Sequence, residues 1–198
     1  MSPPFVHLRL HTEYSLADST IRVKPLVQRC AKLGMPAVAV TDAGNLFSLV
    51  KFYRAAEGAG LKPIVGADLW LSPGAEREPP TRLTLLCRDR RGYGNLSRLV
   101  SRAYLEGRRQ DQVCVSREWV EQSSDGLFLL LGIDSDVGRL LSLHHPNQAR
   151  RALEGWMRRF DHRAYLALSR VGHADETAFL PGALELASRL GCPAIASN

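Results

Sequence analysis

Short apolar runs alternate with amphipathic stretches along the chain, and this alternation restricts the possible folds more than any other feature of the sequence. The run Leu127–Leu131 is wholly apolar, which is typical of a strand buried on both faces of a sheet. Repeated alternation of strands and helices favours a parallel α/β sheet or barrel over a sandwich. We expect roughly seven strands, namely Phe5–Leu10, Ala37–Val40, Pro63–Val65 continuing after a Gly66 kink as Asp68–Leu71, Arg82–Cys87, Leu127–Leu131, Ala164–Leu168 and Ala194–Ala196.

The stretches between these strands carry signals for the ends of helices. Gly34, Gly60 and Gly191 each follow an amphipathic stretch, and Ser116 is placed to cap a short helix. Because sites in parallel α/β folds form at the carboxyl ends of strands, polar residues that directly follow strands are the first functional candidates. The expected helices are Val23–Leu33, Leu46–Ala59, Tyr93–Tyr104, Ser116–Gln122, Val137–Leu143, Gln148–Phe160 and Glu176–Leu190.

Length and composition indicate one globular domain. The chain has 198 residues, of which 45% are apolar and 23% are charged, and this is enough to bury a full core. No apolar run reaches the roughly 20 residues of a membrane helix, and the start Met1–Pro4 lacks the features of a secretion signal. We therefore expect a cytoplasmic protein without membrane contact. Its four scattered cysteines contain no C-x-x-C pair and are expected to be reduced packing residues.

The charge of the chain and the absence of common catalytic motifs exclude several classes of enzyme. The net charge of +6 and the pI of about 9.5 hint at nucleic-acid binding, but the arginines are spread along the whole chain, which is more typical of a solvated surface. The sequence lacks a phosphate loop, an H-E-x-x-H motif and a G-x-S-x-G motif. Asp134, Ser135 and Asp136 could suggest paired metal carboxylates, but we interpret them as the cap of the helix near Val137.

The most informative segment lies at the amino terminus. Alternate residues of a strand share a face, so His7, Arg9 and His11 are expected to align, with Asp18 a short loop later. Two histidines and a carboxylate could ligate a metal, although a histidine on a strand is more often a structural residue. Two further strand ends add Asp42, in Thr41–Asn45, and Asp68, so three consecutive strands deliver these side chains to one rim.

These segments resemble the first motifs of the PHP (polymerase and histidinol phosphatase) domain at the N-terminus of bacterial DNA polymerase III alpha subunits. The resemblance spans essentially the whole chain and implies a distorted seven-stranded, TIM-like (β/α) barrel. It implies that residues 1–198 form a single PHP domain, excised from a much longer polymerase chain and truncated near its last motif. The palm, thumb and fingers are absent, so we expect no DNA polymerisation by this chain alone. Further matching segments are Leu49–Tyr53, Gly58–Asp68, Gly92–Leu96 and Pro193–Asn198.

Several positions depart from the pattern of metal-binding family members. The His-x-His of the first motif is matched by Arg9 and His11, and the last Asp-x-His motif would lie beyond Asn198. Of the expected ligands, His11 and Asp18 remain, together with Asp68, which is one methylene shorter than the family's glutamate. Ala43 and Arg82 stand where metal-binding members have histidines, and Ile133 stands where they have a cysteine. A further ligand position is matched by Val171.

The charge of Arg9 opposes a divalent ion. At an effective dielectric of 20, a guanidinium about 4 Å from such an ion costs roughly 8 kcal/mol, whereas a structural zinc site gains about 10–16 kcal/mol in all. With ligands lost as well, we expect no metal and no other cofactor. Instead, Arg9 and Arg82 are expected to neutralise Asp18, Asp42 and Asp68, which leaves a vestigial pocket held by ion pairs that could accept a phosphate or sulfate.

Three functional hypotheses follow. The resemblance implies that PHP domains with a degraded site support the parent DNA-directed DNA polymerase, a nucleotidyltransferase, and dock the proofreading exonuclease (epsilon) subunit of the polymerase III holoenzyme. The alternative is a metal-dependent phosphoesterase or 3′–5′ exonuclease, as intact members of the family can be. A DNA-binding module ranks last, because the family contacts DNA chiefly through the missing polymerase domains.

Overall fold

The computed structural model describes residues 5–73, 78–109 and 112–197. Its eight-stranded sheet has the order β4-β5-β2-β3-β6-β7-β8, with β1 paired to β2. The strands β1, β2 and β5 run parallel to one another, as do β6, β7 and β8, whereas β3 runs antiparallel to both of its neighbours. The strands are β1 (Ala37–Val40), β2 (Lys62–Leu71), β3 (Thr81–Cys87), β4 (Arg108–Arg109), β5 (Gln112–Val115), β6 (Leu127–Leu131), β7 (Ala164–Leu168) and β8 (Ala194–Ala196).

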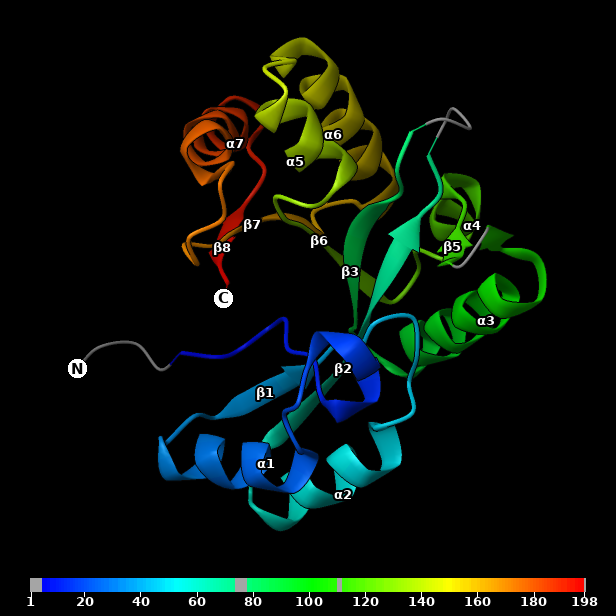
Figure 1. Ribbon diagram of the computed structural model, residues 1–198, viewed down its shortest axis with the longest axis vertical. Coiled ribbons are helices and arrows are strands. Elements are labelled where there is room, and N and C mark those ends of the chain that lie inside the picture. The colour runs from blue at the N-terminus through cyan, green and yellow to red at the C-terminus, as the bar shows by residue number, and fades with distance from the viewer. Residues whose placement is uncertain (1–4, 74–77, 110–111, 198) are drawn as a thin grey trace.

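The helices lie outside the sheet. In Figure 1, α1 and α2 flank β1 and β2 below, α5, α6 and α7 gather beside β6, β7 and β8, and α3 lies at the other side. The helices are the 3-10 helix η1 (Glu13–Asp18), α1 (Val23–Lys32), α2 (Leu49–Gly58), α3 (Arg90–Glu106), α4 (Arg117–Gln122), α5 (Asp136–Ser142), α6 (Pro146–Phe160) and α7 (Glu176–Leu190). In the part of the chain that the structure describes, no helix has the length and apolar character to span a bilayer.

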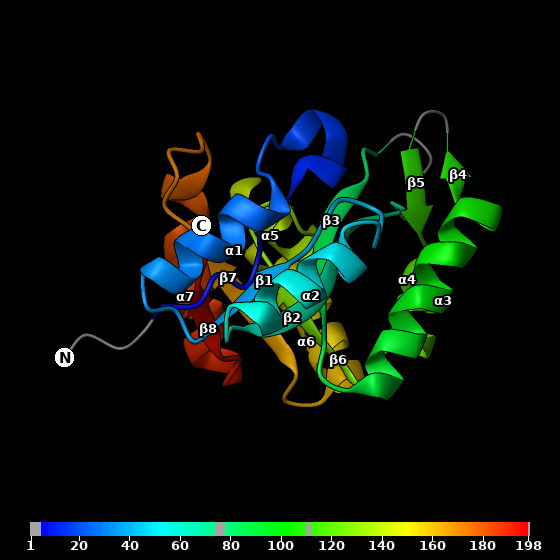
Figure 2. The ribbon, with the colours of Figure 1, turned by 90° about the horizontal axis from the view of Figure 1, so that it is seen from below.

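The sheet curves around a small inner core. This core joins Ala39 of β1, Leu86 of β3, Leu130 of β6 and Ala167 of β7, and Leu8 of the amino-terminal segment packs against it. The amino-terminal segment therefore lies between β1 and β8, as Figures 1 and 2 show from two directions. Strands from both sides of β3 in the sheet order thus share one interior, and the predicted α/β, barrel-like fold is confirmed.

Larger apolar clusters join the outer faces of the strands to the helices. In β6, Leu127, Leu129 and Leu131 belong to the cluster that contains Trp156 and Phe160 of α6. Their alternation with the inward Leu130 explains why the whole of β6 is apolar. A second cluster packs α1 and α2 on β1.

The predicted first strand, Phe5–Leu10, is wrong. This segment runs beside β1, where His7 O accepts from Ala39 N and Leu10 O accepts from Thr41 N, both at 2.8 Å. Leu10 N, however, donates to Thr41 Oγ1 at 3.0 Å rather than to a backbone carbonyl. A side-chain hydroxyl thus replaces a backbone partner, so the regular ladder of a strand is interrupted.

Other differences are smaller. The strand β2 is continuous through Gly66, where an added Cβ would lie 2.6 Å from Leu85 O, so the glycine permits close backbone approach rather than a break. The short strands β4 and β5 and the helix η1 were not predicted. The helix α3 starts three residues earlier than expected, because Asp89 caps it by accepting from Gly92 N at 2.9 Å. The cap at Ser116 and the bounds of α7 are as predicted.

Candidate functional site

Arg9 lies at the centre of an ion-pair network on one rim of the sheet. Its Nε donates to Asp68 Oδ2 at 2.7 Å, and its Nη2 donates to Asp134 Oδ2 at 2.6 Å. Nη1 is 3.3 Å from the other oxygen of Asp134. All three guanidinium nitrogens therefore face carboxylates, in the forked geometry that arginine provides. The guanidinium cross-links the amino-terminal segment to β2 and to the loop after β6.

His11 and Arg82 extend the network to η1. His11 Nε2 lies 2.8 Å from Asp68 Oδ2, and its Nδ1 lies 3.6 Å from Asp18 Oδ2. Arg82, the second residue of β3, donates to Asp18 at 3.0 Å and stacks on Trp70 of β2 with its guanidinium carbon 4.1 Å from the ring centroid. This stacking fixes the arginine over the rim.

Asp68 is the buried anchor of the network, since it is 2% exposed. Burial alone would raise the pKa of its carboxyl, but the charge of Arg9 and the hydrogen bond from His11 outweigh burial, with help from Thr84, and lower the pKa below its ordinary value. The pKa of Arg9 is correspondingly raised, because Asp68 and Asp134 outweigh the effect of its own burial. Both groups are therefore charged at neutral pH.

Asp68 lies within β2 rather than at its end, because the strand continues to Leu71. The sequence pattern predicted a strand end at this position instead. The side chain still reaches the rim, because the amino-terminal segment and the start of β3 meet β2 at this level: Thr84 of β3 is its register partner, and the hydroxyl of Thr84 hydrogen-bonds to Asp68 Oδ1.

Asp42 is not part of this network, contrary to the expected pairing with Arg9 or Arg82. Its buried carboxylate accepts hydrogen bonds from Thr12 N at 2.6 Å, from Ser15 Oγ at 2.7 Å and from Ser48 Oγ at 2.5 Å. Thr12 Oγ1 adds contacts at 2.8 and 2.9 Å. Hydroxyl and amide donors thus satisfy this buried carboxylate in place of a cation. Through these hydrogen bonds, Asp42 connects η1 to the start of α2.

Sequence reasoning missed Asp134. It was interpreted with Ser135 and Asp136 as part of a helix cap. Only Ser135 caps α5, by accepting from Gly138 N at 3.0 Å, whereas Asp134 pairs with Arg9. Its position three residues after the end of β6 was the available signal, because it follows the rule that polar residues after strands reach the rim.

The rim does not fit a bound metal cluster. The Arg9 guanidinium occupies the space between the two carboxylates, and Ala43 offers no side-chain ligand. Ile133 packs against the apolar core and Val171 is exposed at the surface. Among the described residues, no group of three His, Cys, Asp or Glu side chains has the arrangement of a metal site.

The expectation of a phosphate or sulfate site finds little support in the geometry. The donors of Arg9 already face Asp68 and Asp134, and Arg82 donates to Asp18. Two guanidiniums therefore meet three carboxylates. An incoming anion would have to displace one of these carboxylates and would meet the charge of the others.

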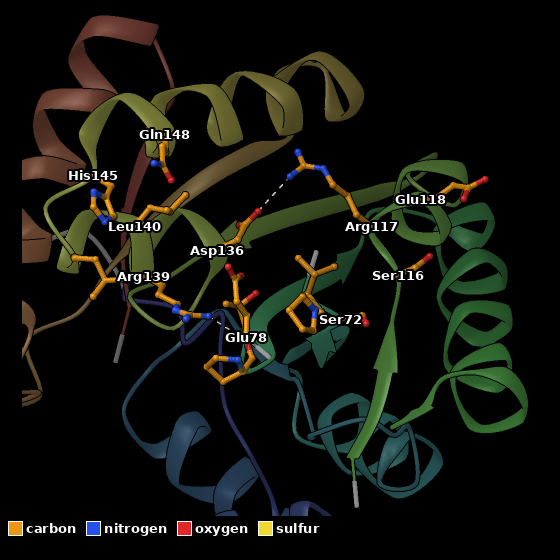
Figure 3. Close-up of a pocket in the computed structure, with 15 residues that line it drawn as sticks. Ser72, Glu78, Ser116, Arg117, Glu118, Asp136, Arg139, Leu140, His145 and Gln148 are labelled. Carbon is orange, nitrogen blue, oxygen red and sulfur yellow. Dashed lines mark hydrogen bonds and ion pairs between the residues drawn. The ribbon is translucent and has the colours of Figure 1, made fainter. Parts of the chain in front are cut away.

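A separate pocket of about 660 Å³ lies between β2, α4 and α5 (Figure 3). Figure 3 shows Arg117 and Asp136 directed toward each other. Arg117 Nη1 lies 3.3 Å from Asp136 Oδ2, and Asp136 also accepts a hydrogen bond from Trp156 Nε1 at 2.9 Å. Burial raises the pKa of Asp136 despite these partners. These contacts join α4, α5 and α6, and none of the predicted site residues lines the pocket.

The fold defines the chain as an α/β protein whose polar side chains gather on one rim of a curved sheet. Sequence comparison identifies the family within this class. The PHP domain family model matches residues 7–171, and the chain belongs to this family. An amidohydrolase from Chromobacterium violaceum has a similar fold, with a TM-score of 0.56, 14% identity, and coverage of 98% of this chain and 86% of that chain.

The more similar relatives are polymerase subunits. The chain is 45% identical over 199 residues to DNA polymerase III subunit alpha of Pseudomonas fluorescens, covering 100% of this chain. It is 48% identical over 210 residues to DNA polymerase III subunit alpha of Xylella fastidiosa, covering 98% of this chain. The chain spans only 17% of the length of each of these relatives.

Proposed function

We propose that the chain is the PHP domain of a DNA polymerase III alpha subunit, acting as a structural module and as a docking site for the proofreading exonuclease subunit, without a catalytic metal cluster. Similarity to polymerase III alpha subunits over the whole chain supports the assignment to this parent. We further propose that the parent protein is a DNA polymerase and that its partners are the other subunits of the polymerase III holoenzyme.

The observation that carries the structural role is the Arg9 guanidinium bridging Asp68 and Asp134. A metal cluster would bring the same carboxylates together through coordination. Here a side chain of the protein neutralises them, so the rim is held without an ion. The alternative, a metal-dependent phosphoesterase or 3′–5′ exonuclease, needs ligands where Arg9, Ala43, Ile133 and Val171 stand.

Calorimetry and gel filtration with the purified exonuclease subunit test the docking role. A stable complex of defined stoichiometry with the 198-residue chain is the expected result. If instead no complex forms and the chain hydrolyses phosphoesters in the presence of manganese or zinc, the enzymatic alternative replaces this proposal.

A further inference from the structure

An exposed groove of about 580 Å³ lies between α2 and the turn that joins β3 to α3. None of its lining residues takes part in the contacts of the Arg9 network. Its floor and walls combine apolar, aromatic and arginine side chains, the principal ones being Val50, Tyr53, Arg54, Arg88, Arg90 and Tyr93.

The apolar part of the groove is exposed without serving the core. Phe52 and Ala56, one helical turn apart, form the buried face of α2, whereas Val50 and Tyr53 lie on another face and are 62% and 44% exposed. Tyr93 of α3 is 43% exposed across the groove. Grouped exposed apolar side chains of this kind mark interaction surfaces, and tyrosine is enriched in such surfaces.

The charge of the groove is positive. Arg54, Arg88 and Arg90 are all exposed, and within the described ranges none of them forms an ion pair with another side chain. The one carboxylate in the lining, Asp89, is committed to capping α3 through Gly92 N. Arginines that have no internal partner keep their charge available for a ligand of opposite sign.

The thiol in the lining is not a nucleophile at neutral pH. Burial, together with the charge of Asp89, raises the pKa of the Cys87 thiol to about 12. The thiol is therefore expected to remain protonated at neutral pH.

We propose that this groove docks an acidic segment of a protein partner, which inserts an apolar side chain against Val50 and Tyr53 while its carboxylates meet Arg54, Arg88 and Arg90. Charge complementarity sets the sign of the partner. The aliphatic side chains of Leu49, Val50 and Val65 in the lining favour a polypeptide, which can place an aliphatic side chain of its own against them. This inference rests on the proposed function, since it assigns a surface to the docking role.

Two substitutions test the groove, each with a matched control elsewhere. Arg88→Glu reverses a groove charge, and Tyr53→Ser removes a groove aromatic. Arg151→Glu on α6 and Tyr104→Ser on α3 alter side chains that are comparably exposed outside the groove. All five proteins, with the unaltered 198-residue chain as reference, are titrated against the labelled exonuclease subunit.

Three further probes separate the classes of ligand: a 12-residue peptide of alternating glutamate and leucine, its lysine–leucine counterpart, and a 20-nucleotide oligothymidine. The groove variants are expected to weaken binding of the exonuclease subunit and of the acidic peptide at least about tenfold, about 1.4 kcal/mol, while the controls change it less than twofold. The lysine peptide should bind at least about tenfold more weakly than the acidic one.

The outcomes are distinct. Equal binding by groove and control variants overturns the groove assignment even if the exonuclease subunit docks. Oligothymidine binding that falls with the groove variants makes the surface a nucleic-acid site and also overturns it. If the exonuclease subunit does not bind the unaltered chain, the proposed docking function fails; the acidic peptide then decides the inference, which is overturned if that peptide binds no better than the lysine peptide.

Discussion

Arg9 makes the rim dependent on a single guanidinium, because two carboxylates from different parts of the chain share it. The partners differ in burial: the Asp68 side chain is 1% exposed and the Asp134 side chain 34%. Loss of the guanidinium would leave Asp134 free to be hydrated, whereas Asp68 would keep a buried charge supported only by His11 and Thr84. Removing one partner of a buried ion pair lowers the stability of the fold far more than replacing both partners by apolar residues.

Arg9→Met is therefore expected to lower the free energy of unfolding by about 3 kcal/mol. Urea denaturation measures this difference. The matched control is Arg22→Met, since Arg22 has a 78% exposed side chain 3.9 Å from Glu13, and its loss should cost less than about 0.5 kcal/mol. Equal, small effects of the two substitutions would show that the Arg9 network contributes little to stability.

The ionisation of Asp68 should make the stability of the protein depend on pH in the acidic range. The folded-state pKa of its carboxyl lies below the unfolded value, so the stabilisation it provides is fully present above the unfolded pKa and is lost as the pH falls through the folded pKa. Unfolding midpoints between pH 2 and pH 7 should therefore fall more steeply below about pH 4 in the original chain than in Asp68→Asn. Parallel curves for the two proteins would contradict the assigned ionisation.

Two glycines of α3 show how element and fold interact. At Gly92 an added Cβ would lie 1.8 Å from Gly126 O, on the turn before β6, whereas at Gly94 it would meet nothing within 4 Å. Gly92 therefore lets the first turn of α3 approach the β6 turn. Gly94 has no such contact and only lowers helix propensity.

The two positions should respond in opposite directions to the same substitution. Gly92→Ala is expected to cost about 3 kcal/mol, because the backbones must separate, and Gly94→Ala is expected to stabilise the protein by about 0.5–1 kcal/mol. Thermal unfolding of both variants checks the pair. A Gly92→Ala protein as stable as the original would refute the close approach.

Most elements could be predicted because their patterns are local. The apolar run of β6 and the glycine that ends α7 at Gly191 require no knowledge of the rest of the fold. The segment Phe5–Leu10 has the composition of a strand but lacks its ladder, since the side chain of Thr41 competes with the backbone for Leu10 N. The strand β4 consists of two arginines, and β5 has only four residues, so neither is long enough to give a pattern.

The sequence predicts most of the residues that form the rim, but it does not predict which of them pair with one another. The sequence indicated Arg9, His11, Asp18, Asp68 and Arg82, and the structure joins all of them in one network. Pairing depends on which side chains the tertiary structure brings within reach.

The two misplaced carboxylates show this limit. Three hydroxyl-bearing residues enclose Asp42, two of them from the segment around η1, and no local pattern announces that enclosure. Asp134 has an alternative local role as a helix cap, which Ser135 fills instead.

At the scale of the whole molecule, the amino-terminal segment lies between β1 and β8 and packs against the inner core. Leu8 packs against the inner core, as does Ile195 of β8, and the next residue, Arg9, pairs with Asp68 and Asp134 of the rim. Packing and ion pairing thus act on neighbouring residues of one segment. The proposed structural role rests on this arrangement, in which side chains rather than an ion hold the rim.

Metal content tests that claim most directly. The chain is purified without chelator and measured by mass spectrometry of the elements, before and after incubation with zinc or manganese followed by dialysis. No stoichiometric metal is expected in either sample. Two or three tightly held ions per chain would contradict it, because substitute ligands would then have to displace Arg9 from Asp68 and Asp134.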